Sequence, residues 1–408
     1  MTMFGLKEAE VSELIRAVTD ERMHGALDRD AIEERFARSV WSGITEPGDR
    51  VAGTLIGAIG ATAALTELLG GLTGDAVTRS LEGSVTRKDL ALARDRWAPR
   101  LASATALTSL RQAVRLGVRL TVPGDPEWIP GVDDLASHAP TVLWMRGRCE
   151  LLAGLSKSVA MVGARAATGY GEHVTMESSA GLVDRGFAIV SGAAYGIDGM
   201  AHRAALASNG VTVAFLAGGV DRFYPSGHDA LLTRIVESGC VISELPCGAQ
   251  PSKWRFLQRN RLIAAASRAT VVLEAGWRSG SLNTAHHAAA LGRPLGAVPG
   301  PVTSAASAGC HRLIREDLAT LVTTAHEMAE LAGDWETDDA VDGAAPEDPR
   351  RVRVLDAIST RAARQPTDIA ARSGLSLLDV MSALGALDLE GIARETPRGW
   401  VRRVLRDT

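Results

Sequence analysis

The first third of the chain carries apolar residues at the spacing of amphipathic helices. In the opening segment they recur every three or four positions, at Val11, Leu14, Ile15 and Val18. A later segment of this kind ends at Gly117, a residue type that often caps helices. Residues 121–135 then hold several turn-forming Gly and Pro and predict a connector, and residues 141–147 read as a short apolar strand. We therefore expect a helical domain over residues 1–150.

From about residue 157 the period of the pattern changes. Short apolar and β-branched runs alternate with helical segments, and most runs end in a loop that contains Gly. The runs are 158–163, 187–192, 211–219, 240–244, 269–276, 294–300 and 319–323. Near-continuous apolar strands separated by helices indicate a parallel sheet covered on both faces. We predict an α/β fold over residues 151–332, a Rossmann-like parallel sheet with helices on both faces, whose ligands bind at the carboxyl ends of the strands.

The last segments differ from both regions. Residues 333–349 are rich in acidic and small residues and predict a solvated linker. Residues 350–408 show three helical patterns and a hairpin, which suggest a small winged-helix module. Its last helix, within 375–391, would be the recognition helix if the module bound DNA. Because that helix carries Asp379, Asp388 and Glu390, a protein-contact or regulatory role is an equal alternative.

Composition narrows the function. The 408 residues have a net charge of −4, so nucleic-acid binding would need a local basic patch. The four cysteines have neither disulfide nor zinc-ligand spacing and read as reduced thiols of a cytoplasmic protein. The opening residues hold no apolar run typical of a signal peptide, and glycines interrupt the weakly polar stretch 51–72. We expect no membrane association, no metal and no cofactor.

The first candidate loop, residues 163–171, follows a predicted strand and precedes a helix. Unpaired N–H groups and the helix dipole make such a turn an anion site. The loop lacks the Lys-Ser/Thr of a nucleotide P-loop and the Gly spacing of a dinucleotide fingerprint. Gly163 and Ala164 would let the backbone approach a ligand, and Arg165 could clamp a phosphate. Stacking of Arg165 against the next loop for stability is the alternative.

A second loop, residues 191–198, ends at Asp198 and opens a helix that carries His202. Its small residues let the backbone approach a ligand closely, and we predict that Gly192 contacts DNA. Asp198 and His202 lie about one helical turn apart. A structural hydrogen bond between them is a simpler explanation than a catalytic pair.

The most informative run is 253–261, which holds four cations and two aromatic residues in a chain with only 4% aromatics. Single-strand binders combine cations on the backbone with rings on which bases stack. A surface salt-bridge cluster is the alternative, although no acidic residue lies between Leu245 and Leu273 to pair with these cations locally. We therefore predict nucleic-acid contacts from Lys253, Phe256, Arg259, Asn260 and Arg261.

A further loop, residues 276–284, joins the run 269–276 to a helix. Its Ser-Gly-Ser turn offers hydroxyl and backbone donors for a phosphate, and we predict contacts from Arg278, Ser279, Gly280 and Ser281. Helix capping alone would explain Ser281 but not the whole run. Glu274, at the end of the strand, could instead be catalytic in a related nucleotide hydrolase.

Together these motifs resemble the DprA/Smf (DNA-processing protein A) family from about Trp97 to Leu331. The ordered motifs are LWMRG, VAMVGARAATGYG, VSGAAYGIDGMAHRAAL, LAGGVDRFYP, SELPCGAQPSKWRFLQRNRLIA, SGSLNTAHHAAALGRPLGAVPG and SAGCHRLI. The resemblance implies a non-enzymatic recombination mediator that binds and protects single-stranded DNA. It further implies that the protein helps to load the RecA recombinase in transformation or repair, and that it forms a homodimer through the Rossmann-like domain.

Two departures from the family pattern concern the predicted pocket. Ala164 replaces a usual Ser and removes a hydroxyl donor, and Leu257 replaces a usual Pro in the turn before Arg259. Two other functions remain as alternatives. One is a Rossmann-like nucleotide phosphoribohydrolase, which usually has a Pro-Gly-Gly-x-Gly-Thr loop where this chain has Ser-Gly-Ser-Leu-Asn-Thr. The other is a protein adaptor with a vestigial pocket.

Overall fold

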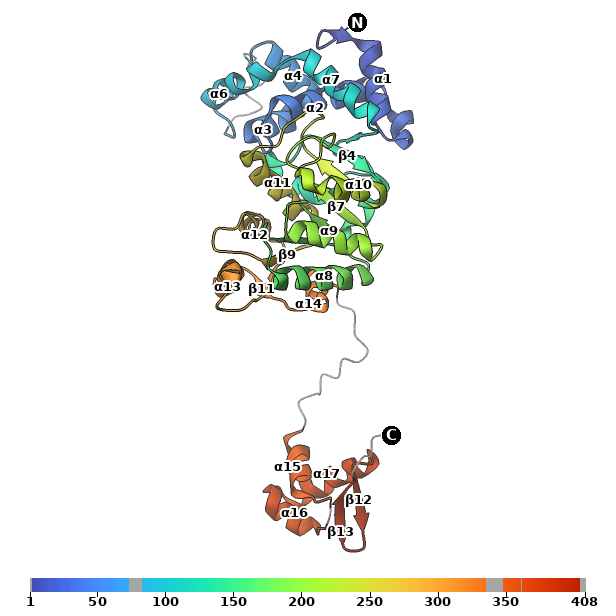
Figure 1. The fold of residues 1–408 in the computed structure, drawn as a ribbon, viewed down its shortest axis with the longest axis vertical. Coiled ribbons are helices and arrows are strands. Elements are labelled where there is room, and N and C mark those ends of the chain that lie inside the picture. Colours follow the sequence, from blue (N-terminus) through green and yellow to red (C-terminus); the bar gives the residue numbers. More distant parts are fainter. Residues whose placement is uncertain (1, 73–82, 335–347, 361, 404–408) are drawn as a thin grey trace. The chain divides into compact units, whose positions relative to one another are not determined.

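The computed structural model describes residues 2–72, 83–334, 348–360 and 362–403. The chain divides into two compact units, residues 1–335 and 336–408. Figure 1 shows the first unit as a group of N-terminal helices beside a sheet with helices on its faces. Each unit is described by itself.

A nine-stranded sheet forms the centre of the first unit, in the order β11-β10-β9-β5-β6-β7-β8-β4-β3. Neighbouring strands from β11 to β8 are parallel, whereas β4 pairs antiparallel with both β8 and β3. The strands are β3 Arg119–Thr121, β4 Leu143–Gly147, β5 Ser158–Gly163, β6 Ala188–Ser191, β7 Thr212–Phe215, β8 Cys240–Ser243, β9 Ala269–Glu274, β10 Leu295–Ala297 and β11 Thr320–Leu321. The predicted α/β fold with a Rossmann-like sheet is confirmed, because the seven predicted runs coincide with β5 to β11.

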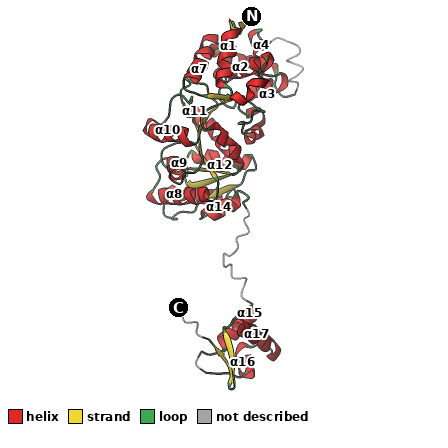
Figure 2. Cartoon of the chain, turned by 90° about the vertical axis from the view of Figure 1, so that its right-hand side faces the viewer, coloured by secondary structure: helices red, strands yellow, loops and turns green. Residues whose placement is uncertain are grey.

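Helices cover both faces of this sheet, as Figure 2 shows from the side. On one face, α11, α12 and α13 pack with alternate strand residues such as Ala160 and Val162; on the other, α8, α9 and α14 pack with Val159 and Met161. The helices are α8 Gly169–Asp184, α9 Ile197–Ala207, α10 Asp229–Ser238, α11 Lys253–Ala266, α12 Ser281–Ala290, α13 Ala308–Arg315 and α14 Ala325–Leu331. Burial on both faces explains why these strands are apolar at successive positions.

The N-terminal helices share a core with the sheet. They are α1 Glu8–Val18, α2 Arg29–Ile44, α3 Arg50–Ile59, α4 Ala61–Leu69, α6 Arg87–Trp97 and α7 Ser103–Arg115, preceded by the short antiparallel strands β1 Thr2–Met3 and β2 Leu6–Lys7. Trp144 of β4 and Val241 of β8 belong to the same apolar cluster as these helices, whereas Leu143 and Met145 face the opposite side. The sheet therefore extends past the boundary that we drew at residue 150.

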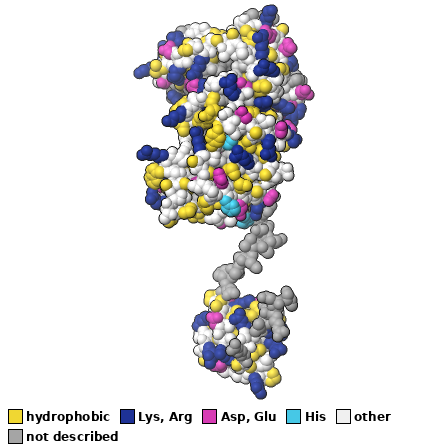
Figure 3. Space-filling model, in the orientation of Figure 1, with side chains coloured by type: hydrophobic (Ala, Val, Ile, Leu, Met, Phe, Trp, Pro, Cys, Tyr) yellow, Lys and Arg dark blue, Asp and Glu magenta, His cyan; other side chains and the backbone are white. Residues whose placement is uncertain are grey.

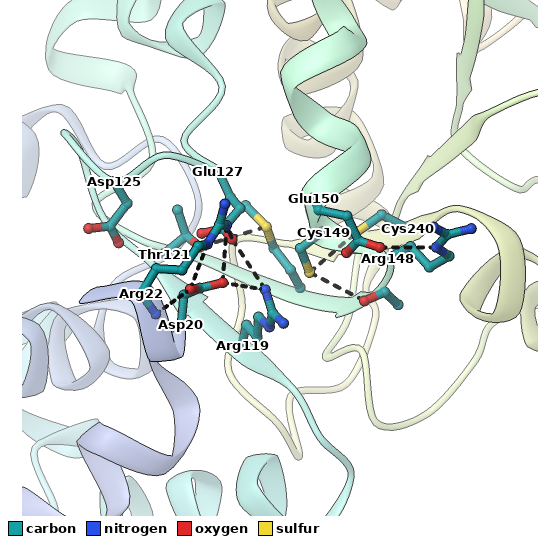
Figure 4. Close-up of polar contacts among 12 residues, drawn as sticks. Asp20, Arg22, Arg119, Thr121, Asp125, Glu127, Arg148, Cys149, Glu150 and Cys240 are labelled. Carbon is teal, nitrogen blue, oxygen red and sulfur yellow. Dashed lines mark hydrogen bonds and ion pairs between the residues drawn. The ribbon is translucent and has the colours of Figure 1, made fainter. Parts of the chain in front are cut away.

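A polar network also ties the N-terminal helices to the sheet (Figure 4). Arg119 of β3 donates a 2.6 Å hydrogen bond to Asp20, and Arg22 bridges Asp20 and Glu127. Asp20 and Glu127 are almost fully buried. Buried carboxylates are stable only when cations and hydrogen bonds surround them, so this network fixes the segment after α1 against β3.

The second unit holds three helices and a hairpin. The elements are α15 Pro349–Ala357, α16 Pro366–Ser373, α17 Leu377–Leu389, β12 Ala393–Thr396 and β13 Gly399–Arg402. Val354, Ile369, Leu384 and Trp400 form its core. On α17, Asp379 pairs with Arg350 and Glu390 with Arg351, while Leu378 and Leu389 remain exposed.

No single helix in the described ranges is long and apolar enough to cross a membrane. Two sharply bent pairs, α3 with α4 and α16 with α17, meet the length and composition requirement only when each pair is taken together.

Candidate functional site

A pocket of about 460 Å³ lies at the carboxyl ends of β5 and β9. The loop after β5, the N-terminal half of α11 and the turn between β9 and α12 line it. Most of the predicted DNA-binding residues meet here, namely Gly163, Ala164, Arg165, Phe256, Arg259, Asn260, Arg278, Ser279, Gly280 and Ser281. Strand order explains this, since β9 is the neighbour of β5 although more than a hundred residues separate them.

Arg259 forms the floor of the site. The residue is 5% exposed, and its guanidinium donates to the carbonyl oxygens of Gly192, at 2.6 Å, and Phe215, at 2.5 Å. Burial lowers the pKa of Arg259 to about 10, while nearby Asp198 raises it. The side chain is therefore still cationic at neutral pH. Backbone carbonyl groups at the ends of β6 and β7 hold its guanidinium in position. Gly192 acts through this contact rather than by lining the pocket.

Phe256 is surrounded by cations and a second ring. The guanidinium carbon of Arg165 lies 5.3 Å from the centre of the Phe256 ring, and that of Arg259 lies 5.9 Å from it. The Tyr224 ring lies 5.4 Å from the same ring, at a tilt of 52°. Cations near an aromatic face are attracted by its quadrupole. The arrangement places positive charge beside an apolar platform, as a base and its phosphate require together.

The cations around the pocket differ in their pairing. Arg165, Lys253 and Arg278 make no ion pair with any carboxylate in the described part of the chain. Lys253 is exposed at the start of α11 and stands outside the pocket lining. Unpaired cations have no local anion to neutralise them, so these three residues can bind phosphates.

The two remaining arginines of the 253–261 run are occupied by distant carboxylates. Arg255 donates to Glu46 twice, at 2.9 Å. Arg261 is 2% exposed and donates to Glu244 at 2.8 Å and to the carbonyl of His138. Arg261 points away from the pocket because α11 turns it by about 200° from Arg259, two residues earlier. Because Arg261 is buried, paired with Glu244 and outside the pocket lining, we do not propose it as a DNA contact. The sequence did not reveal this pairing, since Glu244 belongs to a different segment from the 253–261 run.

The turn between β9 and α12 presents the predicted hydroxyls. The oxygens of Ser279 and Ser281 lie 2.8 Å apart, and the Asn260 amide donates to Asn283 of α12 at 3.2 Å. Asn260 thus holds α12 against α11, and the Ser-Gly-Ser turn faces the pocket across from the Arg165 loop. Because the pocket is built from several segments, it brings the hydroxyl groups of this turn together with the guanidinium groups of Arg165 and Arg259.

The expected Asp198–His202 hydrogen bond is wrong. Asp198 accepts from the backbone N–H of Gly192 at 3.2 Å, whereas Nδ1 of His202 lies 2.7 Å from the Thr212 hydroxyl. Burial raises the pKa of Asp198 and lowers that of His202 to about 3. Asp198 organises the loop after β6, and the sequence could not reveal that β7 supplies a nearer partner for the histidine.

Glu274 is engaged in helix capping. Its carboxylate accepts from the backbone N–H of Thr168 at 2.8 Å and from the Thr168 hydroxyl at 2.7 Å. Glu274 is 2% exposed, and the pocket lining does not include it. These contacts fix the loop after β5 to β9 and thereby position Arg165.

The predicted DNA-binding set did not include Trp277, Leu257 and Asp198, which are among the other residues that line the pocket. Trp277 lies in the predicted loop 276–284. Because aromatic residues make up only 4% of the chain, a tryptophan in that loop was a signal that could have identified it. On the face of the molecule seen in Figure 3, basic side chains are spread among acidic and apolar ones. Among the described residues, this face therefore carries no broad basic patch.

Comparisons with known proteins show to which family the chain belongs. The family model described as DNA recombination-mediator protein A matches residues 119–333. The chain is 46% identical over 316 residues to the DNA processing protein DprA of Mycobacterium tuberculosis, covering 74% of this chain and 80% of that protein. It is 36% identical over 295 residues to protein Smf of Escherichia coli, covering 69% and 76% of the two chains.

A solved structure shows the same similarity. DNA processing protein A from Streptococcus pneumoniae superposes with a TM-score of 0.56 at 28% sequence identity, covering 73% of this chain and 97% of that one. The matched family model spans the nine-stranded sheet and all the segments that line the pocket. The chain therefore belongs to the DNA recombination-mediator protein A family, whose members carry the names DprA and Smf.

Proposed function

We propose that this protein binds single-stranded DNA in the pocket between α11 and the loops after β5 and β9. The observation that carries the proposal is the Phe256 ring beside the guanidinium groups of Arg165 and Arg259. A base stacks on Phe256, and the adjoining phosphates contact Arg165, Lys253 and Arg278. The Ser279–Ser281 turn donates hydrogen bonds to the same backbone. Single strands are favoured because a ring can stack only on a base that is not paired inside a duplex.

The function is binding rather than catalysis, and no metal or cofactor takes part. The nucleotide-hydrolase alternative requires a free carboxylate in the pocket. The Glu274 carboxylate accepts both of its hydrogen bonds from Thr168, and that of Asp198, which lines the pocket, accepts from the backbone N–H of Gly192. A hydrolysis screen with nucleoside monophosphates separates the two: release of a free base that is lost in Glu274→Gln would favour the hydrolase.

The bound strand is protected and then passed to RecA recombinase, during natural transformation or repair. We propose that the protein acts in the cytoplasm as a homodimer formed through the Rossmann-like domain, 151–332. The N-terminal helical domain, 1–150, supports that domain. We further propose that residues 350–408 form a winged-helix module, joined by the acidic linker 333–349. Membership of a recombination-mediator family, and similarity to proteins named for DNA processing, support these proposals.

Fluorescence anisotropy tests strand binding. A labelled poly-dT oligonucleotide and a duplex of the same length are titrated with the full chain at two salt concentrations. The Arg165→Ala, Lys253→Ala double variant is the test. Arg203→Ala is the control, since Arg203 is an exposed arginine on α9 that contacts the sulfur of Met200.

We expect a preference for the single strand that weakens with salt. Each lost phosphate contact should reduce the slope of log affinity against log salt by about 0.7. The double variant should lose about two such contacts, and the control none. Equal binding of duplex and single strand, or a double variant that binds as the wild type does, would overturn the proposal.

A further inference from the structure

A second aromatic ring lines the same pocket as Phe256. Trp277 lies in the turn between β9 and α12, and its side chain is 53% exposed. Phe256 belongs to α11, so the two rings come from different segments that border one cavity. Exposed rings beside cations are the arrangement on which unpaired bases stack in single-strand binders.

The guanidinium of Arg312 packs against the indole ring of Trp277. The guanidinium carbon of Arg312, on α13, lies 4.8 Å from the centre of the indole ring. The side chain of Arg312 is only 19% exposed and has a carboxylate nearby, Glu316 at 3.9 Å. A fixed cation against an indole restricts the rotamers of the ring, so less conformational entropy is lost when a ligand stacks on it.

The neighbours of Trp277 supply the polar part of a nucleotide site. Arg278 follows it directly and has no ion pair among the described residues, and the Ser279 and Ser281 hydroxyls come next in the turn. Indole, guanidinium and hydroxyl groups within five consecutive residues match what a base, a phosphate and a sugar each need. Trp254 offers a contrast, since it is equally exposed, at 55%, but stands outside the pocket lining.

We propose that Trp277 is a second base-stacking platform, so that the pocket binds two bases of one strand, one on Phe256 and one on Trp277. The phosphates between them lie against Arg278 and the Ser279–Ser281 turn. This inference rests on the proposed single-strand binding and deepens it by assigning a second subsite and its ligand, an unpaired nucleobase. The competing explanation is a surface clamp in which Trp277 only fastens α13 through Arg312.

The test compares Trp277→Leu and Trp277→Phe in the full chain, with labelled poly-dT as the probe. Leucine keeps apolar contact but cannot stack, and phenylalanine keeps a ring. We expect Trp277→Leu to weaken binding by about fivefold or more and Trp277→Phe by less than about twofold. Trp254→Leu, the matched control, should bind as the wild type does. Thermal unfolding of each variant shows whether the fold is retained.

Additivity tells two platforms from one. If the rings hold different bases, the fold-losses of Phe256→Leu and Trp277→Leu should multiply in the double variant. If both rings contact a single base, the double variant should be little weaker than either single one, which overturns the two-base arrangement. Tryptophan emission gives an independent reading, since poly-dT should quench the wild type more than it quenches Trp277→Phe.

The outcomes separate this inference from the function on which it rests. Wild-type affinity in Trp277→Leu, together with weak binding by the Arg165→Ala, Lys253→Ala variant, would overturn the second platform and leave the proposed function standing. Loss of thermal stability without a selective loss of binding would assign Trp277 to the surface clamp instead. A wild-type protein without single-strand preference would overturn both.

Discussion

The guanidinium of Arg259 occupies the space beside the α-carbon of Gly192. It donates to the Gly192 carbonyl at 2.6 Å, and a Cβ built on Gly192 would come within 2.4 Å of three of its atoms. The small size of residue 192 is thus what admits a buried cation to the floor of the pocket. Gly192 and Arg259 form a single structural unit, although 67 residues separate them.

Gly192→Ala should displace Arg259 and weaken the pocket. The added methyl group overlaps a guanidinium that is held at two carbonyls, so we expect a loss of about 1–3 kcal/mol in the free energy of unfolding. Binding of poly-dT should fall as well, because Arg259 supports the Phe256 ring. Urea unfolding and anisotropy check both effects. Gly57→Ala is the control, since a Cβ there meets open space; equal behaviour of the two variants would contradict the prediction.

Phe256→Ala should remove one stacked base. The expected loss is about 1–3 kcal/mol of binding free energy, measured by anisotropy with poly-dT. Phe256→Tyr should retain most of the affinity because the ring remains. Tyr195→Ala serves as the control, since Tyr195 is 47% exposed and lies outside the pocket lining. Unchanged affinity in Phe256→Ala would refute the stacking role.

Arg261→Ala should reduce stability rather than DNA affinity. It removes the partner of Glu244, whose side chain is only 12% exposed, and an unpaired buried carboxylate destabilises a fold by about 3–5 kcal/mol. Arg293→Ala removes a more exposed pair with Asp134 and should change stability by less than about 1 kcal/mol. Anisotropy at a temperature where both variants are folded should give wild-type affinity. A selective loss of binding in Arg261→Ala would return this residue to the site.

His202 should make the protein less stable in acid. The Thr212 hydroxyl donates to the Ile189 carbonyl, so it accepts from Nδ1–H of a neutral His202, and Nε2 has no hydrogen-bond partner among the described residues. Burial lowers the pKa of His202 from 6.5 to about 3. Between these values the unfolded chain binds the extra proton, so stability is full above pH 6.5 and falls by about 1.4 kcal/mol per pH unit below it.

Unfolding by urea at pH 7.5 and pH 5 measures this effect. His202→Asn keeps a donor near the position of Nδ1 but does not titrate, so its loss of stability between the two pH values should be smaller than that of the wild type. His173→Asn is the control, because the His173 side chain is 76% exposed. The same pH difference in all three proteins would show that His202 does not contribute.

The strands were predictable because burial on both faces leaves long apolar runs, as in β5 and β9. The meeting of Arg165 with Phe256 and Ser279 followed from the rule that parallel strands share a carboxyl edge. The pairing of the arginines did not follow. Arg261 and Arg255 looked unpaired within their own run, yet Glu244 and Glu46 reach them from other elements. Local sequence shows which charges exist, whereas tertiary contacts decide which of them remain available.

The antiparallel pair β3 and β4 also determines where the chain can be divided. Because β4 hydrogen-bonds along β8, a fragment that starts at residue 151 would leave the N–H and C=O groups of β8 unpaired at an open edge. It would also uncover the apolar side chain of Val241, which packs in the cluster of the N-terminal helices. We expect such a fragment to aggregate through β8. The first 150 residues therefore cover this edge of the sheet and prevent its pairing with other chains.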